Sequence, residues 1–216
     1  AAGKDGVADL LTVFAYPLPI DVIAELLDIP TAERSRFADL SHAIAQGMDH
    51  FHSGEVRRKL REIGAYFFGL LSERRGSTGE DLVRRLAELE HEGDRLNELE
   101  VTAMCTALVF GGHETTVNLI GNGMLALLRR PDAMSRLRSD PSLWPSAIEE
   151  LLRVDSPPQM ISRVAASTFV LRDRTLSEGD SILLCLGAAN RDPEVFASPD
   201  HLDVARAPNP HLGFGA

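Results

Sequence analysis

The sequence predicts a mainly α-helical protein with a small β-sheet near its C-terminal end. Through roughly the first 150 residues, apolar side chains recur at the three- and four-residue spacing of helices that pack by one face. After Pro157 and Pro158 the pattern changes to short runs rich in Val, Ile and Leu that are bounded by turn residues. A composition of 44% hydrophobic and 25% charged residues fits an ordinary globular protein.

The first part of the chain has the pattern of four helices, over residues 19–27, 31–45, 55–75 and 81–89. Apolar residues line one face of the first helix, which ends at Pro30 because proline cannot continue a helix. Thr31 is suited to the N-cap of the second helix, with Glu33 in its first turn. Polar and glycine-rich residues over 47–54 and 76–79 predict the loops that follow.

The longest predicted helix covers residues 98–130 and would span roughly 50 Å at 1.5 Å per residue. Asn97 followed by Glu100 has the pattern of a capping box at its start, and Pro131 marks its end. Two shorter helices are predicted over 132–139 and 142–154. Strands are then predicted over 164–171 and 181–186, with turns at 172–174 and 177–180.

Charge and cysteine usage argue against several classes of protein. A net charge of −10 disfavours nucleic-acid binding, which usually needs a basic surface. Cys105 and Cys185 have apolar neighbours and no metal-ligand spacing, which predicts two buried thiols in a reducing compartment, the cytoplasm. The longest apolar stretch, 101–128, is interrupted by polar and charged residues such as Glu114, so no membrane span is expected.

The centre of the long helix is unusual for a sequence selected for stability alone. Gly111 and Gly112 each cost roughly 1 kcal/mol in a helix interior relative to alanine. The carboxylate of Glu114 is flanked by apolar runs and would be costly to bury unpaired. Two interpretations stay open. Either two helices join at the glycines with Glu114 in solvent, or the glycines make room for a flat ligand, with Glu114 and Thr115 supplying protons.

The helix over 142–154 carries a possible ion pair. Glu150 and Arg153 are three residues apart and share a helix face. Helical periodicity places Trp144 and Ile148 on the apolar side and this pair away from it, so spacing alone predicts a surface ion pair worth a few tenths of a kcal/mol. Arg163, after the two prolines, is on spacing alone either an exposed strand residue or a ligand for an anionic group.

These features resemble the cytochrome P450 family, in the order in which the family has them. Residues 111–116, Gly-Gly-His-Glu-Thr-Thr, are similar to the oxygen-binding stretch of its long helix, and residues 15–30 are similar to the fifth helix of bacterial members. The Glu-x-x-Arg pair at 150–153 and Asn-Arg-Asp-Pro at 190–193 also match. Residues 209–216, Asn-Pro-His-Leu-Gly-Phe-Gly-Ala, match the opening of the haem-binding loop, Phe-Gly-x-Gly-x-His-x-Cys.

The resemblance covers essentially the whole chain and implies a cytochrome P450 fold, with residues 1–216 as one partial domain. The N-terminal sheet and the first helices would precede Ala1, and the cysteine that ligates the haem iron would fall five positions beyond Ala216. Neither Cys105 nor Cys185 can replace it, because one lies in the long helix and the other in a predicted strand. We therefore expect a fragment that ends just before the axial cysteine and has no metal ligand of its own.

The resemblance also implies roles for individual residues. In the family the two small residues lie over the haem, and the acid and the first threonine, here Glu114 and Thr115, guide protons to dioxygen. Arg163 matches the arginine that pairs with a haem propionate. The implied haem-binding residues are Gly111, Gly112, Arg163, His211 and Phe214, and the implied structural lock beside the haem is a buried triad of Glu150, Arg153 and Arg206.

The implied activity is that of a haem-thiolate monooxygenase, which inserts one atom of O2 into an apolar organic substrate. Its expected partners are haem b (iron protoporphyrin IX) and a ferredoxin-type protein that delivers electrons from NAD(P)H. The helices over 31–45 and 55–75 are expected to act as a lid over the substrate. The alternative is a catalytically dead fragment or remnant without haem-thiolate ligation. No nucleic-acid or membrane partner is expected.

Overall fold

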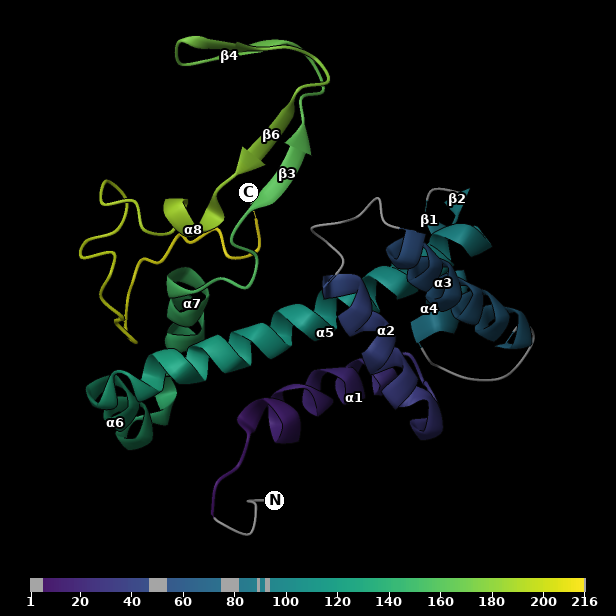
Figure 1. Ribbon diagram of the computed structural model, residues 1–216, viewed down its shortest axis with the longest axis horizontal. Coiled ribbons are helices and arrows are strands. Elements are labelled where there is room, and N and C mark those ends of the chain that lie inside the picture. The colour runs from purple at the N-terminus through teal and green to yellow at the C-terminus, as the bar shows by residue number, and fades with distance from the viewer. Residues whose placement is uncertain (1–5, 47–53, 75–81, 89, 92–93, 216) are drawn as a thin grey trace. The chain divides into compact units, whose positions relative to one another are not determined.

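The computed structural model describes residues 6–46, 54–74, 82–88, 90–91 and 94–215. The chain divides into two compact units, Ala1–Val117 and Asn118–Ala216. The longest helix, α5 (Glu98–Leu128), contributes to both units, because the division falls within it (Figure 1). The predicted class is confirmed: the described chain is mainly helical, with small antiparallel sheets.

The first unit is helical apart from two very short strands. Its elements before α5 are η1 (Leu11–Ala15), α1 (Pro17–Leu26), η2 (Thr31–Glu33), α2 (Arg34–Gln46), α3 (Gly54–Arg74), α4 (Leu82–Glu88), β1 (Glu90–His91) and β2 (Asp94–Arg95). The four predicted helices are confirmed within a few residues. The prediction of Thr31 as an N-cap is wrong. Pro30 is the N-cap residue and is extended, and Thr31 is the first residue of the short 3-10 helix η2.

The core of the first unit joins one face each of α1, α2, α3 and the first half of α5. Its buried side chains include Ile23, Phe37, Phe67 and Val109. Full burial of a side chain of this size contributes about 1.5–3 kcal/mol. This core therefore fixes α1 and α2 against the part of α5 that carries the glycine pair.

The start of α5 is set by the predicted capping box. Asn97 Oδ1 accepts hydrogen bonds from the backbone N–H groups of Leu99 and Glu100, at 3.0 and 3.1 Å, and Glu100 Oε2 accepts from the Asn97 N–H at 2.8 Å. From there α5 stays α-helical through Gly111 and Gly112. The interpretation of two helices joined at the glycines is therefore wrong.

The second unit begins with the last turns of α5 and adds short helices and two strand pairs. Its further elements are α6 (Pro131–Ser139), η4 (Pro141–Leu143), α7 (Trp144–Val154), β3 (Ile161–Val164), β4 (Phe169–Leu171), β5 (Arg174–Leu176), β6 (Ser181–Leu184) and α8 (Leu186–Ala189). β3 pairs antiparallel with β6, and β4 pairs with β5 in a hairpin beyond them (Figure 1). The core joins α5, α6 and α7 to the segment of Leu202 and Val204.

The strand prediction is partly wrong. Instead of one strand over 164–171, β3 ends at Val164 and β4 starts at Phe169, because the backbone of Ala165 bonds to Gly179 and Asp180 in the following turn. Strand β5 was not predicted. The turn at Arg172 is present, with φ at 56°.

The cysteine prediction is confirmed for Cys105, which is buried, and wrong for Cys185, which lies exposed between β6 and α8. Strand residues alternate between two sides, so apolar neighbours do not fix the side on which a cysteine lies.

Among the described residues, no helix combines the length and apolar character that crossing a membrane requires.

Candidate functional site

The two glycines at the centre of α5 have different surroundings. A methyl group built on Gly112 would lie 2.7 Å from Cδ1 of Ile23, so this glycine allows α1 to approach α5 closely. A methyl group built on Gly111 would meet nothing within 4 Å. The room that the sequence predicted at both positions is therefore present at Gly111 and absent at Gly112, where Ile23 fills it.

Thr115 and Glu114 follow the open position within one helical turn. The Thr115 hydroxyl donates a hydrogen bond to the carbonyl oxygen of Gly111, at 2.5 Å. A hydroxyl that bonds back to the carbonyl four residues earlier lies against the same helix face as that residue. The hydroxyl of Thr115 is therefore held on the side of the helix that is open at Gly111.

Glu114 has a partner from another helix. Its Oε2 lies 3.4 Å from Nδ1 of His42 on α2. The ring of Tyr16 stands edge-on to the ring of His42, with centroids 5.6 Å apart. Burial raises the pKa of the Tyr16 phenol, and the charges of Glu114 and Asp9 raise it further. The carboxylate thus lies at a junction of α2 and α5 that also contains a neutral phenol.

His113 is a buried residue for which the sequence predicted no role. Its Nε2 lies 3.2 Å from the carbonyl oxygen of Tyr16, and its Nδ1 is buried without a hydrogen-bond partner. Burial lowers the pKa of His113, although the Tyr16 carbonyl and the charge of Glu114 oppose this. Because a carbonyl only accepts, Nε2 carries the proton and the ring is neutral. His113 therefore ties α5 to the start of α1.

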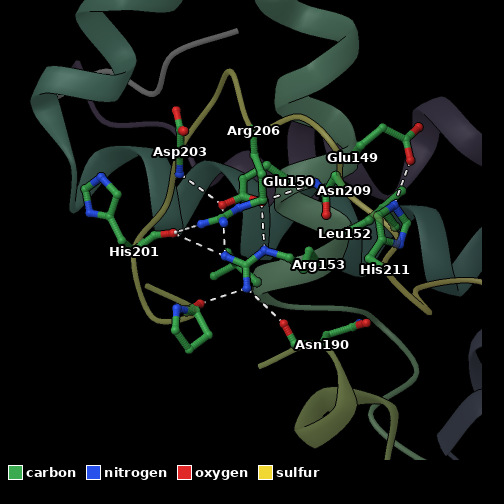
Figure 2. A network of polar contacts seen from close by, with 12 residues as sticks. Glu149, Glu150, Leu152, Arg153, Asn190, His201, Asp203, Arg206, Asn209 and His211 are labelled. Carbon is green, nitrogen blue, oxygen red and sulfur yellow. Dashed lines mark hydrogen bonds and ion pairs between the residues drawn. The ribbon is translucent and has the colours of Figure 1, made fainter. Parts of the chain in front are cut away.

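In the second unit, Glu150 is the centre of a buried polar network (Figure 2). Arg153 donates to both of its oxygens, from Nε at 2.7 Å and Nη2 at 2.8 Å, and Arg206 Nε donates at 2.9 Å. The Asp203 backbone N–H and the Asn209 amide add bonds of 2.9 and 3.2 Å. Glu150 and Arg153 have fully buried side chains. The structure therefore brings Glu150, Arg153 and Arg206 together.

The two arginines extend the network to the backbone between α8 and Arg206. Arg153 donates to the carbonyl oxygens of Asn190, Pro199 and His201, at 2.9, 2.7 and 3.1 Å. Arg206 donates to the carbonyl oxygens of Ala197 and His201, at 2.9 and 3.1 Å. The segment over residues 190–201 has little regular secondary structure, and its backbone carbonyls accept hydrogen bonds from arginine side chains instead of from other backbone groups. These bonds hold the segment to α7.

The prediction from periodicity that Glu150 and Arg153 form a surface ion pair is wrong, because both side chains are buried. Trp144 and Ile148, which periodicity placed in the core, are 40% and 43% exposed, whereas Glu150 and Arg153 are covered by the segment after α8. Burial by itself would raise the pKa of Glu150. The hydrogen bonds from Arg153, the Asp203 N–H and Arg206 outweigh it and hold this pKa below its ordinary value, so the carboxylate stays ionised.

Of the other predicted site residues, which lie in the second unit, Arg163 and Phe214 are at its surface. Arg163 on β3 is exposed, and its Nη1 donates to the carbonyl of Ser162 at 3.0 Å. Phe214 is 85% exposed. His211, three residues earlier, directs Nε2 to the carboxylate of Glu149 at 2.6 Å. No group of three or more histidines, cysteines or acids is arranged to hold a metal ion within the described part of the chain.

A separate cavity of about 680 Å3 lies in the first unit, between α3, α4 and the start of α5. Its lining includes Phe68, Leu71, Leu96 and Val101. Val101 and Glu114 are separated by roughly 20 Å along the helix axis at 1.5 Å per residue. This cavity is therefore distinct from the region of Glu114 and Thr115.

Comparisons with known proteins agree on one family. The family model described as "Cytochrome P450" matches residues 8–141 and 142–207. The "Biotin biosynthesis cytochrome P450" of Bacillus subtilis is 38% identical over 214 residues, which are 96% of this chain and 53% of that protein. The "6-deoxyerythronolide B hydroxylase" of Saccharopolyspora erythraea is 37% identical, over 99% of this chain and 53% of that protein.

Solved structures give the same result. The structure of the bacillaene polyketide synthase cytochrome P450 PksS from Bacillus subtilis superposes with a TM-score of 0.90 and 38% identity, over 97% of this chain and 54% of that chain. The chain therefore spans about half the length of the curated relatives it matches.

Proposed function

The chain belongs to the cytochrome P450 family, and from this we propose that the whole protein is a haem-thiolate monooxygenase. In this proposal it inserts one atom of O2 into a C–H or C=C bond of an apolar organic substrate. A relative named as a hydroxylase supports this reaction type. The continuity of α5 through both units supports a single cytochrome P450 domain.

The proposal rests on the surroundings of Gly111. This position is open, the Thr115 hydroxyl is held on the same helix face, and the Glu114 carboxylate follows in the same turn. Conversion of one oxygen atom of O2 to water consumes two protons. A hydroxyl group can donate these protons in the right direction, and an acid can then restore the proton of the hydroxyl. We assign Thr115 as the donor and Glu114 as the acid that restores its proton.

The contact between Glu114 and His42 supports the role of the acid. A carboxylate has to exchange protons with solvent between turnovers, and the His42 side chain is 38% exposed. His42 Nδ1 lies 3.4 Å from Glu114 Oε2, so an imidazole that is accessible to water adjoins the half-buried acid. His113, with its Nε2 proton bound to the Tyr16 carbonyl, holds the same turn of α5 against the start of α1.

The family implies a haem, and we propose that it is haem b. When bound, the haem supplies the iron at which dioxygen is activated. Gly111 leaves space for a flat ring, and Phe214 offers an exposed apolar side chain. Arg163 is exposed and uses Nη1 for a single backbone carbonyl, which suits its guanidinium to a haem propionate. We propose Gly111, Arg163 and Phe214 as the residues that contact the haem, and Gly112 and His211 as residues that position the backbone next to them.

The remaining partners follow from the reaction. Two electrons per turnover are proposed to come from NAD(P)H through a ferredoxin-type protein. The substrate is proposed to lie on the open face of α5, with α2 and α3 as its lid, because α2 already contacts Glu114 through His42. Glu150, Arg153 and Arg206 are proposed to lock the segment before the haem-binding loop to α7.

Two measurements on the whole protein test this function. The carbon monoxide difference spectrum of the reduced protein is expected to show the far-shifted Soret band of thiolate-ligated haem, and its absence would favour the non-catalytic alternative. Thr115→Ala is expected to continue to consume NAD(P)H while product falls, because protons no longer reach oxygen in order. Product formation fully coupled to NAD(P)H consumption in that variant would remove Thr115 from the mechanism.

A further inference from the structure

We propose that His211 is a positioning residue, which fastens the loop over residues 209–215 to α7 through one defined tautomer of its ring. The imidazole lies beside the Glu149 carboxylate (Figure 2), and its other nitrogen accepts from the Gly213 backbone N–H. The inference rests on the proposed function in one respect, that this loop opens the haem-binding loop. It assigns His211 a role through the loop and not through contact with haem.

The two contacts of His211 select one protonation state of the ring. The Gly213 N–H lies 3.0 Å from Nδ1 and can only donate, so Nδ1 has to present a lone pair. The ionised Glu149 carboxylate lies 2.6 Å from Nε2 and can only accept, so Nε2 has to carry the proton. The neutral Nε2–H tautomer satisfies both contacts. The other tautomer loses both, and the imidazolium loses the bond from Gly213.

Steric contacts fix the position of the ring as closely as the hydrogen bonds do. A methyl group built on Gly213 would lie 2.9 Å from His211 Nδ1 and 3.2 Å from Cβ of Leu152. Only glycine at this position therefore allows the ring and α7 to approach the loop so closely. The His211 side chain is 5% exposed, whereas that of Glu149 is 53% exposed.

Adjacent acids on α7 hold two different points of the loop. Glu150 accepts from the Asn209 amide at 3.2 Å, and Glu149 binds His211 two residues later. The Leu212 N–H donates to Asn190 Oδ1 at 2.7 Å, which ties the loop to the end of α8. Of the hydrogen bonds described for residues 211–213, only the one between His211 Nε2 and Glu149 reaches α7.

The consequence for the proposed haem site concerns Phe214. This exposed side chain follows Gly213 directly, and its ring centroid lies 6.3 Å from that of His211. Both ring nitrogens of His211 already have partners within the chain, so the ring has no donor left for a propionate. His211 therefore sets the position of Phe214 relative to α7.

Two substitutions in the whole protein separate the two bonds. In His211→Asn, the amide oxygen lies near the place of Nδ1 and can accept from Gly213, but the side chain is too short to reach Glu149. In His211→Gln, the amide nitrogen can reach Glu149, but no acceptor remains for Gly213. His201→Gln is the matched control, because His201 is an exposed histidine that contributes its backbone carbonyl to the same network.

Hydrogen exchange of the loop amides, followed by mass spectrometry, measures the clamp without reference to activity. His211→Gln is expected to speed exchange at Gly213 about fivefold, the factor for one ordinary hydrogen bond, whereas His211→Asn and His201→Gln leave it near the wild-type rate. The 15N spectrum of the labelled imidazole is expected to show the neutral Nε2–H tautomer. An imidazolium or Nδ1–H ring at neutral pH, or unchanged exchange in His211→Gln, would overturn the proposal.

The carbon monoxide spectrum then links the clamp to the haem. Both His211 variants are expected to lower the fraction of reduced protein with the thiolate signature, while His201→Gln keeps the wild-type fraction. Wild-type fractions in both His211 variants would reject the positioning role. A wild-type protein without this signature would instead refute the proposed function, and the exchange result would still decide whether the clamp exists.

Discussion

Removal of the charge of Glu150 should destabilise the protein more than any change to an exposed acid. In Glu150→Gln the side chain keeps its volume but loses one acceptor oxygen and the negative charge. The carboxylate accepts five hydrogen bonds in the described structure, two of them from the buried guanidinium of Arg153. The substitution thus leaves a buried cation without its counter-charge.

The expected loss is about 3 kcal/mol in the free energy of unfolding, at the lower end of the range for a buried pair that loses one partner, because glutamine retains one acceptor. Glu194→Gln, an exposed acid in the same unit, is the control and should change stability by less than about 0.5 kcal/mol. Urea unfolding of the whole protein at neutral pH, followed by circular dichroism, measures both variants.

The pH dependence provides an internal check. The pKa of Glu150 in the folded protein lies below its ordinary value of 4.5, so its stabilisation is fully present above about pH 4.5 and is lost as pH falls through the folded pKa. The difference between wild type and Glu150→Gln should therefore narrow in acid. A Glu150→Gln variant as stable as Glu194→Gln at neutral pH would refute the assignment of a buried, ionised hub.

Three further predictions concern other parts of the first unit. The free energy of unfolding of Gly112→Ala should be at least about 1 kcal/mol lower than that of Gly111→Ala, because both gain the same helix propensity but only the new methyl group at 112 meets the Ile23 side chain. Ile23→Val should reduce this difference. Equal stabilities of the two alanine variants would contradict the close approach of α1. His113→Leu should lower the free energy of unfolding by about 1 kcal/mol, because it removes the hydrogen bond from His113 to the Tyr16 carbonyl, and a neutral effect in thermal unfolding would argue against that bond. Thr116→Ala should keep product yield per NAD(P)H near the wild-type value while Thr115→Ala lowers it severalfold; equal yields would remove the distinction between the two hydroxyls.

Local patterns in the sequence predicted the elements that depend on local chemistry. The capping box at Asn97 and Glu100 and the proline at 131 were sufficient to place both ends of α5 within two residues. Strand β5 was not predicted, because it has only three residues and periodicity over so few positions carries little information.

The sites depend on residues that are distant in the chain. Glu150 and Arg153 are buried by backbone that follows them by 37 to 53 residues, and no pattern within α7 reports that cover. His42 precedes Glu114 by 72 residues, so their contact has no local signal. The family resemblance predicted the triad of Glu150, Arg153 and Arg206 correctly. Helical periodicity considers only the positions of apolar residues, and it placed Glu150 and Arg153 on the exposed side of α7.

The most direct test of the central claim is carbon monoxide binding to the reduced whole protein and to its Gly111→Leu variant. Leucine is a good helix former, so the substitution keeps α5 but fills the open space beside Thr115. The wild type should show the thiolate-shifted band, and the variant should bind carbon monoxide at least tenfold more weakly, a difference of about 1.4 kcal/mol. Undiminished carbon monoxide binding by Gly111→Leu would contradict the placement of the haem against this position.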